Sequence, residues 1–239
     1  MKDLYLIGNA HIDPVWLWSW QEGYHEVKAP FLSALDRLDE YDGFLFTCAC
    51  AQYYAWLEQD AQPLFQRVKK EVARGRICLV GGMWIQPDLN IPSGESLVRQ
   101  LLVSQRYFLS RFGHIAITGY NVDSFGQSGM LAMLYKKAGM KNYVWMRPGD
   151  SENPDIPQGA FRLKSVDGSE VLSFRIPYDM GAYTCKENIA GKIDFLRERA
   201  KQTGAAQMVF YGVGNHGGGP TKKLLNEIES LLPKQDDVC

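Results

Sequence analysis

Three polar segments with metal-binding or acid-base side chains directly follow apolar runs of this chain. The first run, Leu4–Gly8, is followed by His11 and Asp13. Two residues apart in an extended chain, these side chains project to the same side, so an imidazole nitrogen and a carboxylate can reach one ion. The pair alone is weak evidence, because a hydrogen-bonded core histidine beside a loop aspartate has the same spacing.

The other two segments contribute a second carboxylate and a second imidazole. Asp123 follows the run Ile115–Asn121, and by itself it suits a helix cap or a turn as well as catalysis. His216 stands among five glycines, which permit close backbone approach and indicate a shaped site, with a flexible surface loop as the alternative. Together His11, Asp13, Asp123 and His216 suit one Zn²⁺ ion, and Co²⁺ or Mn²⁺ would also accept these ligands.

The glycine segment also matches a dinucleotide-binding pattern through Gly212, Gly214 and Gly217. That pattern needs a helix that opens at once and an acidic residue about 20 positions later, after a second strand. Here Gly218-Gly219-Pro220 delays the helix, and too few residues follow for the second strand. Pro220 also breaks the phosphate-binding GxxxxGK[ST] pattern. The sequence therefore does not predict nucleotide binding.

The elements that must position these residues are short apolar runs in alternation with segments of helical period. The expected strands are Leu4–Gly8, Phe44–Cys48, Ile77–Val80, Ile115–Asn121, Tyr143–Trp145 and Gln207–Tyr211. The expected helices are Ala29–Tyr41, Ala61–Arg74, Ser93–Phe112, Ser128–Ala138 and Asn188–Thr203. This alternation predicts an α/β fold with a distorted, barrel-like, mostly parallel sheet, whose strand carboxyl ends gather the polar segments at one mouth.

One segment late in the chain departs from this alternation. Asp167-Gly168 lies between Phe161–Val166 and Glu170–Ile176, which predicts an antiparallel β-hairpin. No fixed repeat, low-complexity tract or Pro/Ser-rich linker marks a boundary. We therefore expect residues 1–239 to form a single domain that carries this hairpin as an insertion.

Composition and charge exclude several classes of partner. The 239 residues include 26 Lys and Arg against 27 Asp and Glu, for a net charge of -1, which offers no basic surface to nucleic acid or an anionic membrane. The apolar runs are far shorter than the ~20 residues that span a bilayer, and no signal peptide is recognisable, so we expect a cytoplasmic protein. The five cysteines lack CxxC spacing and suit buried reduced thiols.

Four longer motifs give a more specific indication of the protein family than any single residue pair. HIDPVWLW, GGMWIQPDLNIPSGESLVRQ, NVDSFGQ and GNHGGGP follow one another along essentially the whole chain. In this order they resemble the catalytic domain of the class II α-mannosidases, glycoside hydrolase family 38. The resemblance implies a (β/α) barrel-like domain of the type found in glycoside hydrolases and deacetylases.

The resemblance also assigns the metal ligands and the two catalytic carboxyl groups. It implies that His11, Asp13, Asp123 and His216 hold one zinc ion, and that Asp123 is also the nucleophile of a covalent mannosyl-enzyme. Asp179, in the sequence Tyr178-Asp179, is the best match to the family's acid/base. Such a pair would hydrolyse terminal α-mannosides with retention, and zinc would bind the 2-hydroxyl of mannose and its neighbour.

Several further residues are expected around the substrate. By resemblance, Trp16 and Phe125 would pack against the sugar, and Arg147 would lie beside the nucleophile. Trp84 follows the expected strand Ile77–Val80 directly and could also contact the sugar. The expected partner is therefore an α-mannoside or a mannose-containing oligosaccharide, and the full-length protein could form homo-oligomers.

Members of this family are several times longer, with a helical domain and β-sandwich domains after the catalytic one. We therefore expect this chain to be truncated before those domains, and able to fold and bind metal while hydrolysing little. One alternative is a metal-dependent sugar deacetylase or amidohydrolase, although amidohydrolases typically begin with H-x-H rather than H-x-D. The other is a non-catalytic carbohydrate-binding fragment.

Overall fold

The computed structural model describes residues 3–149, 151–178, 183–214 and 218–232. The chain forms two compact units. Unit 1 comprises Met1–Thr47, Arg74–Cys78 and Asp179–Cys239, whereas unit 2 comprises Cys48–Ala73 and Leu79–Tyr178. Unit 1 thus combines segments that are far apart in the sequence, whereas the two segments of unit 2 are separated only by Arg74–Cys78. The organisation of residues 1–239 as one domain stays a prediction.

The sheet of unit 1 has parallel strands around a central β1. Its order is β3 (Ile77–Leu79), β2 (Phe46–Cys48), β1 (Leu4–Asn9) and β8 (Gln207–Tyr211). β1 pairs in parallel with β2 on one side and with β8 on the other. The carboxyl ends of β1 and β8 therefore lie next to each other, and residues that follow these two strands emerge at the same edge.

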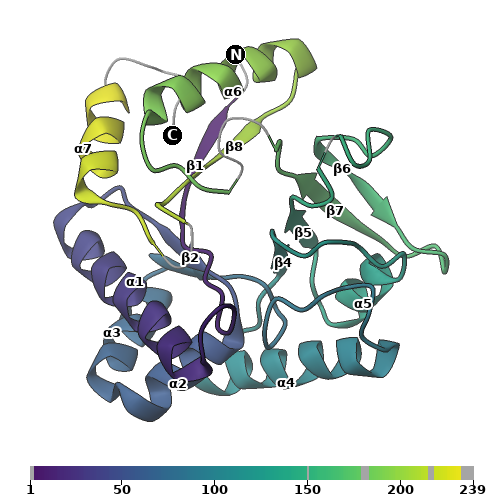
Figure 1. Cartoon of the computed structure of the whole chain (residues 1–239), viewed down its shortest axis with the longest axis horizontal. Helices are drawn as coiled ribbons and strands as arrows, with labels where there is room; N and C mark the ends of the chain where they lie inside the picture. The colour runs from purple at the N-terminus through teal and green to yellow at the C-terminus, as the bar shows by residue number, and fades with distance from the viewer. Residues whose placement is uncertain (1–2, 150, 179–182, 215–217, 233–239) are drawn as a thin grey trace. The chain divides into compact units, whose positions relative to one another are not determined.

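Three helices belong to unit 1: α1 (Trp20–Glu40), α6 (Ile189–Thr203) and α7 (Lys222–Leu231). Figure 1 shows α6 beside β1 and β8, and Ile189, Ile193 and Leu196 are buried on that helix. Asn188 caps α6 by accepting a hydrogen bond from the Gly191 amide at 3.0 Å. Burial of these side chains holds the helix against the sheet.

The N-terminal end of α1 corrects a sequence-based expectation. The helix begins at Trp20 rather than at Ala29, and Pro30 lies inside it. A capping interaction sets this start, because the Glu22 carboxylate accepts a hydrogen bond from the Ser19 amide at 3.0 Å. The additional turns carry mostly polar and half-exposed side chains, so they contribute little apolar periodicity.

The sheet of unit 2 has the order β4 (Thr118–Asn121), β5 (Asn142–Trp145), β7 (Glu170–Arg175) and β6 (Gly159–Lys164). β4, β5 and β7 are parallel, while β6 pairs antiparallel with β7. The predicted hairpin is confirmed, and Gly168 at its turn has a φ of 83°, which glycine adopts readily.

Four helices belong to unit 2: α2 (Ala51–Asp60), α3 (Gln62–Ala73), α4 (Gly94–Phe112) and α5 (Leu131–Lys137). The structure confirms α3, α4 and α5 to within a few residues. α2 was not predicted, and neither was α7 in unit 1. A core cluster of this unit consists of Met83, Leu89, Leu97, Leu101, Leu131, Ala132, Leu134, Tyr135, Met140, Tyr143, Trp145 and Val171.

The mixed α/β architecture with parallel strands is confirmed, and its closure into a barrel-like sheet stays a proposal. In the described part of the chain, no helix has the length and apolar character needed to cross a membrane. The cysteines in that part are free; Cys48, Cys50 and Cys185 are buried as expected, whereas Cys78 is exposed. Cys78 is therefore a correction to the expectation of buried thiols. It stands at the middle of the short strand β3, with its side chain on the accessible face.

Candidate functional site

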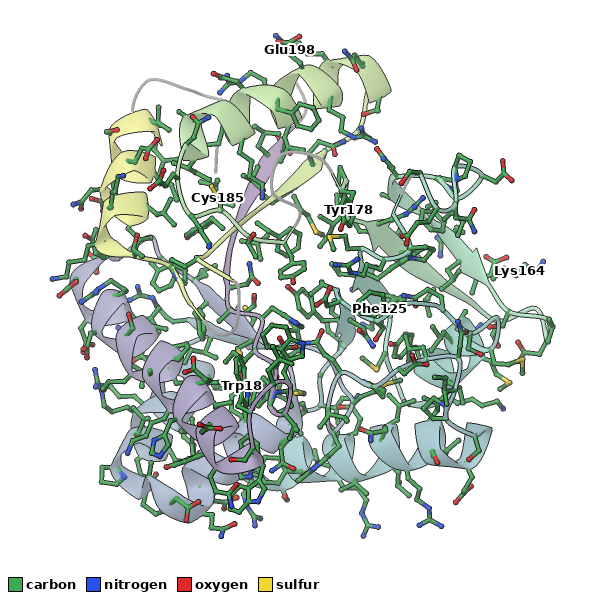
Figure 2. The ribbon with its side chains drawn as sticks, viewed as in Figure 1. Trp18, Phe125, Lys164, Tyr178, Cys185 and Glu198 are labelled. Atoms are coloured by element: carbon green, nitrogen blue, oxygen red, sulfur yellow. The ribbon has the colours of Figure 1, made fainter. Side chains whose placement is uncertain are left out.

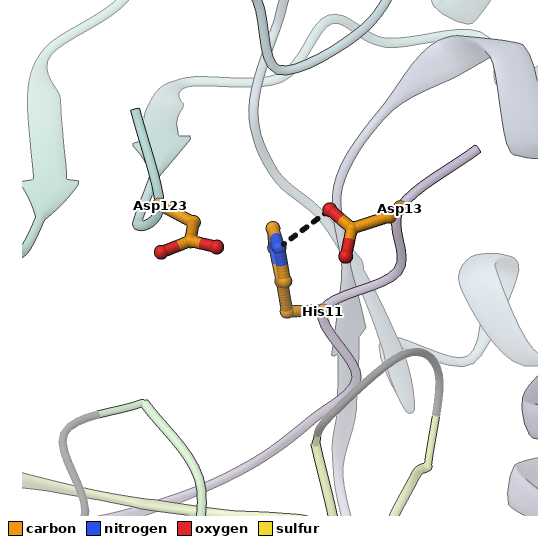
Figure 3. Close-up of side chains that lie close together, drawn as sticks. All are labelled: His11, Asp13 and Asp123. Atoms are coloured by element: carbon orange, nitrogen blue, oxygen red, sulfur yellow. Dashed lines mark ion pairs between the residues drawn. The ribbon is translucent and has the colours of Figure 1, made fainter. Parts of the chain in front are cut away.

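His11 and Asp13 form an ion pair directly after β1. His11 is 5% exposed, and its Nε2 lies 3.4 Å from Oδ1 of Asp13. The dashed line in Figure 3 marks this pair. The intervening Ile12 is also buried, and in an extended segment it projects to the opposite side, which leaves the two polar side chains on a common side. The structure thus pairs these two residues as their spacing predicts.

Main-chain contacts hold this segment in place. The Trp18 indole donates a hydrogen bond from Nε1 to the Asp13 carbonyl oxygen at 3.0 Å. The Ala10 amide donates to the Thr47 carbonyl at 3.3 Å, which continues the pairing of β1 with β2. The ring of Tyr183 packs edge-on against the His11 imidazole, with 5.0 Å between centroids. Both polar side chains are therefore oriented by their surroundings.

Asn9 is a site residue that sequence reasoning missed. It is 2% exposed, and its side-chain amide donates to the carbonyl oxygens of Tyr183 at 2.9 Å and Tyr211 at 3.3 Å. The Cys185 amide also donates to the Gly212 carbonyl at 2.7 Å. Asn9 thus joins the end of β8 to the segment around Tyr183. The sequence offered one sign of this role, namely that Asn9 is a polar residue at the end of an apolar strand.

His216 lies outside the described residues, but the glycines on either side of it are described. Gly214 and Gly218 are bridged, with the Gly214 amide donating to the Gly218 carbonyl at 2.8 Å. Gly212 has a φ of 147°, and a Cβ there would lie 2.1 Å from the Asn9 carbonyl oxygen. A side chain at this position is therefore excluded by close backbone approach.

Asp123 follows β4 and is held by Arg147, which follows β5. Nε of Arg147 donates to Oδ1 of Asp123 at 2.6 Å, and both side chains are about a quarter exposed. A charge-assisted hydrogen bond of this length fixes the orientation of the carboxylate. The structure places Arg147 beside Asp123, and the role of Asp123 as nucleophile stays a prediction.

Two aromatic rings flank the Arg147 guanidinium. Its Cζ lies 4.7 Å from the centroid of the Phe125 ring and 5.5 Å from that of Tyr178, both labelled in Figure 2. Phe125 is 77% exposed, so its ring retains a large accessible surface. These distances are within the range of cation-π attraction. Phe125 therefore orients Arg147 and still offers apolar surface to another molecule.

The two tryptophans predicted to contact sugar differ in their surroundings. Trp16 is half-exposed and packs edge-on against Trp18, with 5.3 Å between ring centroids. Trp84 is half-buried, and its indole N–H donates to Oε1 of Gln52 at 2.7 Å. Trp84 also packs edge-on against Tyr107. Trp84 therefore takes part in internal packing, whereas Trp16 presents more surface to solvent.

The predicted acid/base, Asp179, lies outside the described residues. Its separation from Asp123 therefore stays a prediction. His11 and Asp13 belong to unit 1, and Asp123 belongs to unit 2. His11 and Asp13 offer an imidazole nitrogen and a carboxylate, and Asp123 offers a carboxylate of its own; these are groups to which metal ions such as Zn²⁺ bind.

The whole chain matches one protein family. Residues 1–235 match the family described as Glycosyl hydrolases family 38 N-terminal domain. The chain belongs to this family. The resemblance carried by the four motifs is therefore confirmed, and the motif residues described above are those of a family 38 domain.

Relatives of this family 38 domain are α-mannosidases. Alpha-mannosidase G of Dictyostelium discoideum is 30% identical over 230 residues, which cover 95% of this chain and 21% of that protein. The alpha-mannosidase of Saccharomyces cerevisiae is 30% identical over 237 residues, or 97% of this chain and 21% of that protein. The chain thus spans about a fifth of the length of these curated relatives.

The fold of the family 38 domain also has a counterpart among crystal structures. An alpha-mannosidase from Enterococcus faecalis V583 aligns with a TM-score of 0.76 and 18% identity. The alignment covers 98% of this chain and 27% of that protein. At this identity, the structural similarity supports the mixed α/β fold alone. Any inference about function rests instead on the family match and the site residues.

Proposed function

We propose that this domain carries the catalytic residues of a zinc-dependent, retaining α-mannosidase that hydrolyses terminal α-mannosides. The observation that carries the proposal is the family 38 match over residues 1–235, in a chain whose Asp123 carboxylate is held by Arg147 at 2.6 Å. The family supplies the reaction class. The ion pair supports the presence of an ionised, oriented carboxylate after a parallel strand.

The ligands proposed for one zinc ion are His11, Asp13, Asp123 and His216. Their chemistry fits the metal, because Zn²⁺ binds imidazole nitrogen and carboxylate oxygen. His11 is buried, and its neighbours Asp13 and Tyr183 orient the ring. When bound, zinc would act as a Lewis acid toward adjacent hydroxyl groups of mannose. We propose that a barrel-like arrangement of the parallel strands brings these ligands to one mouth.

The proposed reaction uses two carboxyl groups in a double displacement. Asp123 attacks the anomeric carbon and forms a glycosyl-enzyme, while Asp179 protonates the departing glycosidic oxygen. Water then attacks the glycosyl-enzyme, and Asp179 accepts its proton. Arg147 would keep the Asp123 carboxylate ionised and aimed until it attacks, because its Nε already donates to that group.

Aromatic surface is proposed to position the mannose ring. Trp16 and Phe125 are the more exposed of the predicted aromatic residues. Trp84 could contribute through the part of its indole that is not engaged with Gln52 and Tyr107. Aromatic faces suit the apolar C–H groups of a sugar, while Arg147 and the carboxylates supply its polar contacts.

The test is hydrolysis of a chromogenic α-mannoside and trapping with a fluorinated mannosyl reagent. We expect Asp123→Ala to abolish hydrolysis and labelling, and peptide mapping to locate the label on Asp123 in the unmodified chain. Acetate release from an N-acetylated sugar without mannoside hydrolysis would instead identify a deacetylase. The family match does not favour that alternative or a non-catalytic fragment.

A further inference from the structure

We propose that Gln127 is a positioning residue whose amide fixes the main chain at Arg147 and thereby holds the guanidinium on Asp123. This inference rests on the proposed function only in that it treats Asp123 as the nucleophile. The contacts that carry it lie within unit 2 and connect the segment that follows β4 with Tyr143 of β5 and with the segment that follows β5. Neither the apolar pattern nor the metal-ligand motifs assign Gln127 a role.

The side-chain amide of Gln127 makes hydrogen bonds through both its nitrogen and its oxygen. Its Nε2 donates to the Arg147 carbonyl oxygen at 2.9 Å, and its Oε1 accepts from the Tyr143 hydroxyl at 2.6 Å. A main-chain carbonyl can only accept, so the amide nitrogen must face Arg147 and the amide oxygen must face Tyr143. Gln127 therefore ties an interior residue of β5 to the main chain just beyond that strand.

The Tyr143 end of this connection is anchored in the core. Tyr143 is 1% exposed and packs against Tyr135, with 4.8 Å between ring centroids. Burial raises the pKa of Tyr143 well above its usual value, so its hydroxyl remains a donor. The ring cannot shift without disturbing a close-packed cluster. Gln127 is thus held by a rigid partner.

The Arg147 end leads directly to the proposed nucleophile. The guanidinium lies between Phe125 and Tyr178 and donates to Asp123 at 2.6 Å. These contacts hold the head of the side chain, whereas Gln127 holds the main chain from which it extends. Without that second constraint, Arg147 could move with its loop, and the direction of its hydrogen bond to Asp123 would change. Small changes in nucleophile placement slow a displacement reaction steeply.

The test compares two substitutions at Gln127 with a matched control. Gln127→Glu keeps the size and the acceptor for Tyr143 but cannot donate to Arg147, and Gln127→Met removes both contacts without adding charge. The control is Gln105→Met, the same change at a buried glutamine whose amide nitrogen donates to the Ala116 carbonyl at 2.8 Å and whose amide oxygen accepts from the Ala116 amide at 3.0 Å. Gln105 lies on α4, and these hydrogen bonds join that helix to the segment before β4.

The first readout needs neither substrate nor metal. NMR would follow the Arg147 Nε–H resonance, assigned by its loss in Arg147→Lys, and measure its exchange with solvent. We expect exchange to accelerate about tenfold or more in both Gln127 variants, because the hydrogen bond to Asp123 is less constrained. Gln105→Met should leave this exchange unchanged. Unchanged exchange in both Gln127 variants would overturn the inference.

The second readout is mannoside hydrolysis by the metal-loaded protein. A positioning role predicts a fall in kcat of about tenfold to a hundredfold with KM within about twofold, because substrate binding is preserved while the reacting carboxylate is misaligned. Unchanged kcat with altered exchange would also overturn the inference. If a protein that contains the additional chain of the curated relatives hydrolyses no mannoside, the proposed function fails, and the NMR result still decides the role of Gln127.

A third variant guards against loss of folding at Gln127. Tyr143→Phe removes only the hydroxyl that orients the Gln127 amide and leaves the ring in the core. We expect it to change Arg147 Nε–H exchange in the same direction as the Gln127 variants and to a smaller extent. If the Gln127 variants do not fold and Tyr143→Phe leaves the Arg147 Nε–H exchange unchanged, the connection through Tyr143 is contradicted.

Discussion

At the residue scale, the site depends on polar side chains whose surroundings fix them. His11 packs against the Tyr183 ring and lies beside Asp13, while Asp123 is held by Arg147. The Arg147–Asp123 ion pair is largely buried and is therefore screened less than a surface pair. The residue-scale predictions concern a proposed metal ligand and a buried lysine.

His11→Ala should lose stoichiometric zinc, because the proposed site would lose one of two imidazole ligands. Metal analysis after dialysis measures the zinc content. His114→Ala is the matched control, since His114 is exposed and its Nδ1 lies near the Phe112 carbonyl, after helix α4. His216→Ala should behave like His11→Ala. Stoichiometric zinc in both ligand variants would place the metal elsewhere.

Lys192 should make stability depend on alkaline pH. Burial lowers the pKa of Lys192 from 10.5 to about 8, although its Nζ donates to the Thr184 carbonyl at 3.0 Å. Between these values the unfolded chain binds more protons than the folded chain, so Lys192 makes the free energy of unfolding rise with pH. Between the two pKa values, Lys192 changes the free energy of unfolding by at most roughly 3 kcal/mol.

Urea unfolding of Lys192→Met and the unmodified chain, at several pH values between about 8 and 10.5, isolates this contribution. Other titrating groups, including buried cysteines and tyrosines, cancel in the difference. The stability advantage of Lys192→Met should shrink as the pH rises. Lys201→Met, at an exposed position on the same helix, should show no such trend. A constant difference for Lys192→Met would contradict the prediction.

At the element scale, the ends of strands and helices decide where polar residues emerge. β1, β4 and β5 are each followed by residues of the candidate site, and the glycines at the helix ends let the chain turn into the next strand. α4 shows this clearly, because it ends at Gly113 with a φ of 79°. That conformation is costly for residues with a Cβ atom.

Gly113→Ala should lower the free energy of unfolding by about 1–2 kcal/mol, through backbone strain alone. A Cβ at Gly113 would meet no atom within 4 Å, so no clash contributes. Gly94→Ala is the control at the other end of α4, where space is also open and φ is not positive. Urea unfolding should show no loss for Gly94→Ala. Equal losses in both variants would remove the conformational explanation.

At the scale of the whole molecule, the proposed activity requires two carboxyl groups in a fixed relation. A retaining glycosidase holds them about 5–5.5 Å apart, whereas an inverting enzyme leaves roughly 6.5–9.5 Å for a water molecule. The chain spans about a fifth of its curated relatives, so a protein containing the additional chain of those relatives is the stronger test of turnover.

We expect α-mannose as the first product of α-mannoside hydrolysis, because Asp123 is proposed to attack the anomeric carbon and water to displace it in turn. An NMR time course resolves the anomers before they interconvert. An Asp123→Asn variant should give no burst of either anomer. Initial release of β-mannose would exclude the double displacement and leave Asp123 only as a proposed metal ligand.

The sequence by itself determined the parts of this protein that local signals encode. Apolar runs predicted the parallel strands, and Asp167-Gly168 predicted the hairpin. The positions that follow strands indicated His11, Asp13 and Asp123 as candidate site residues. These features depend on neighbours in the chain, through strand alternation, turn conformation and the order of the motifs. The four motifs together were sufficient to indicate family 38.

Only the tertiary structure decided which residues distant in sequence constrain the site. The contacts of Gln127 with Tyr143 and Arg147 span 16 and 20 residues, and Asn9 reaches Tyr183 across 174. No local periodicity encodes such pairs, because a polar side chain after a strand can meet any segment that packs there. The helix α2 was missed because its buried face, formed by Ala51, Tyr53, Tyr54 and Leu57, consists largely of alanine and tyrosine and so gives only a weak apolar periodicity.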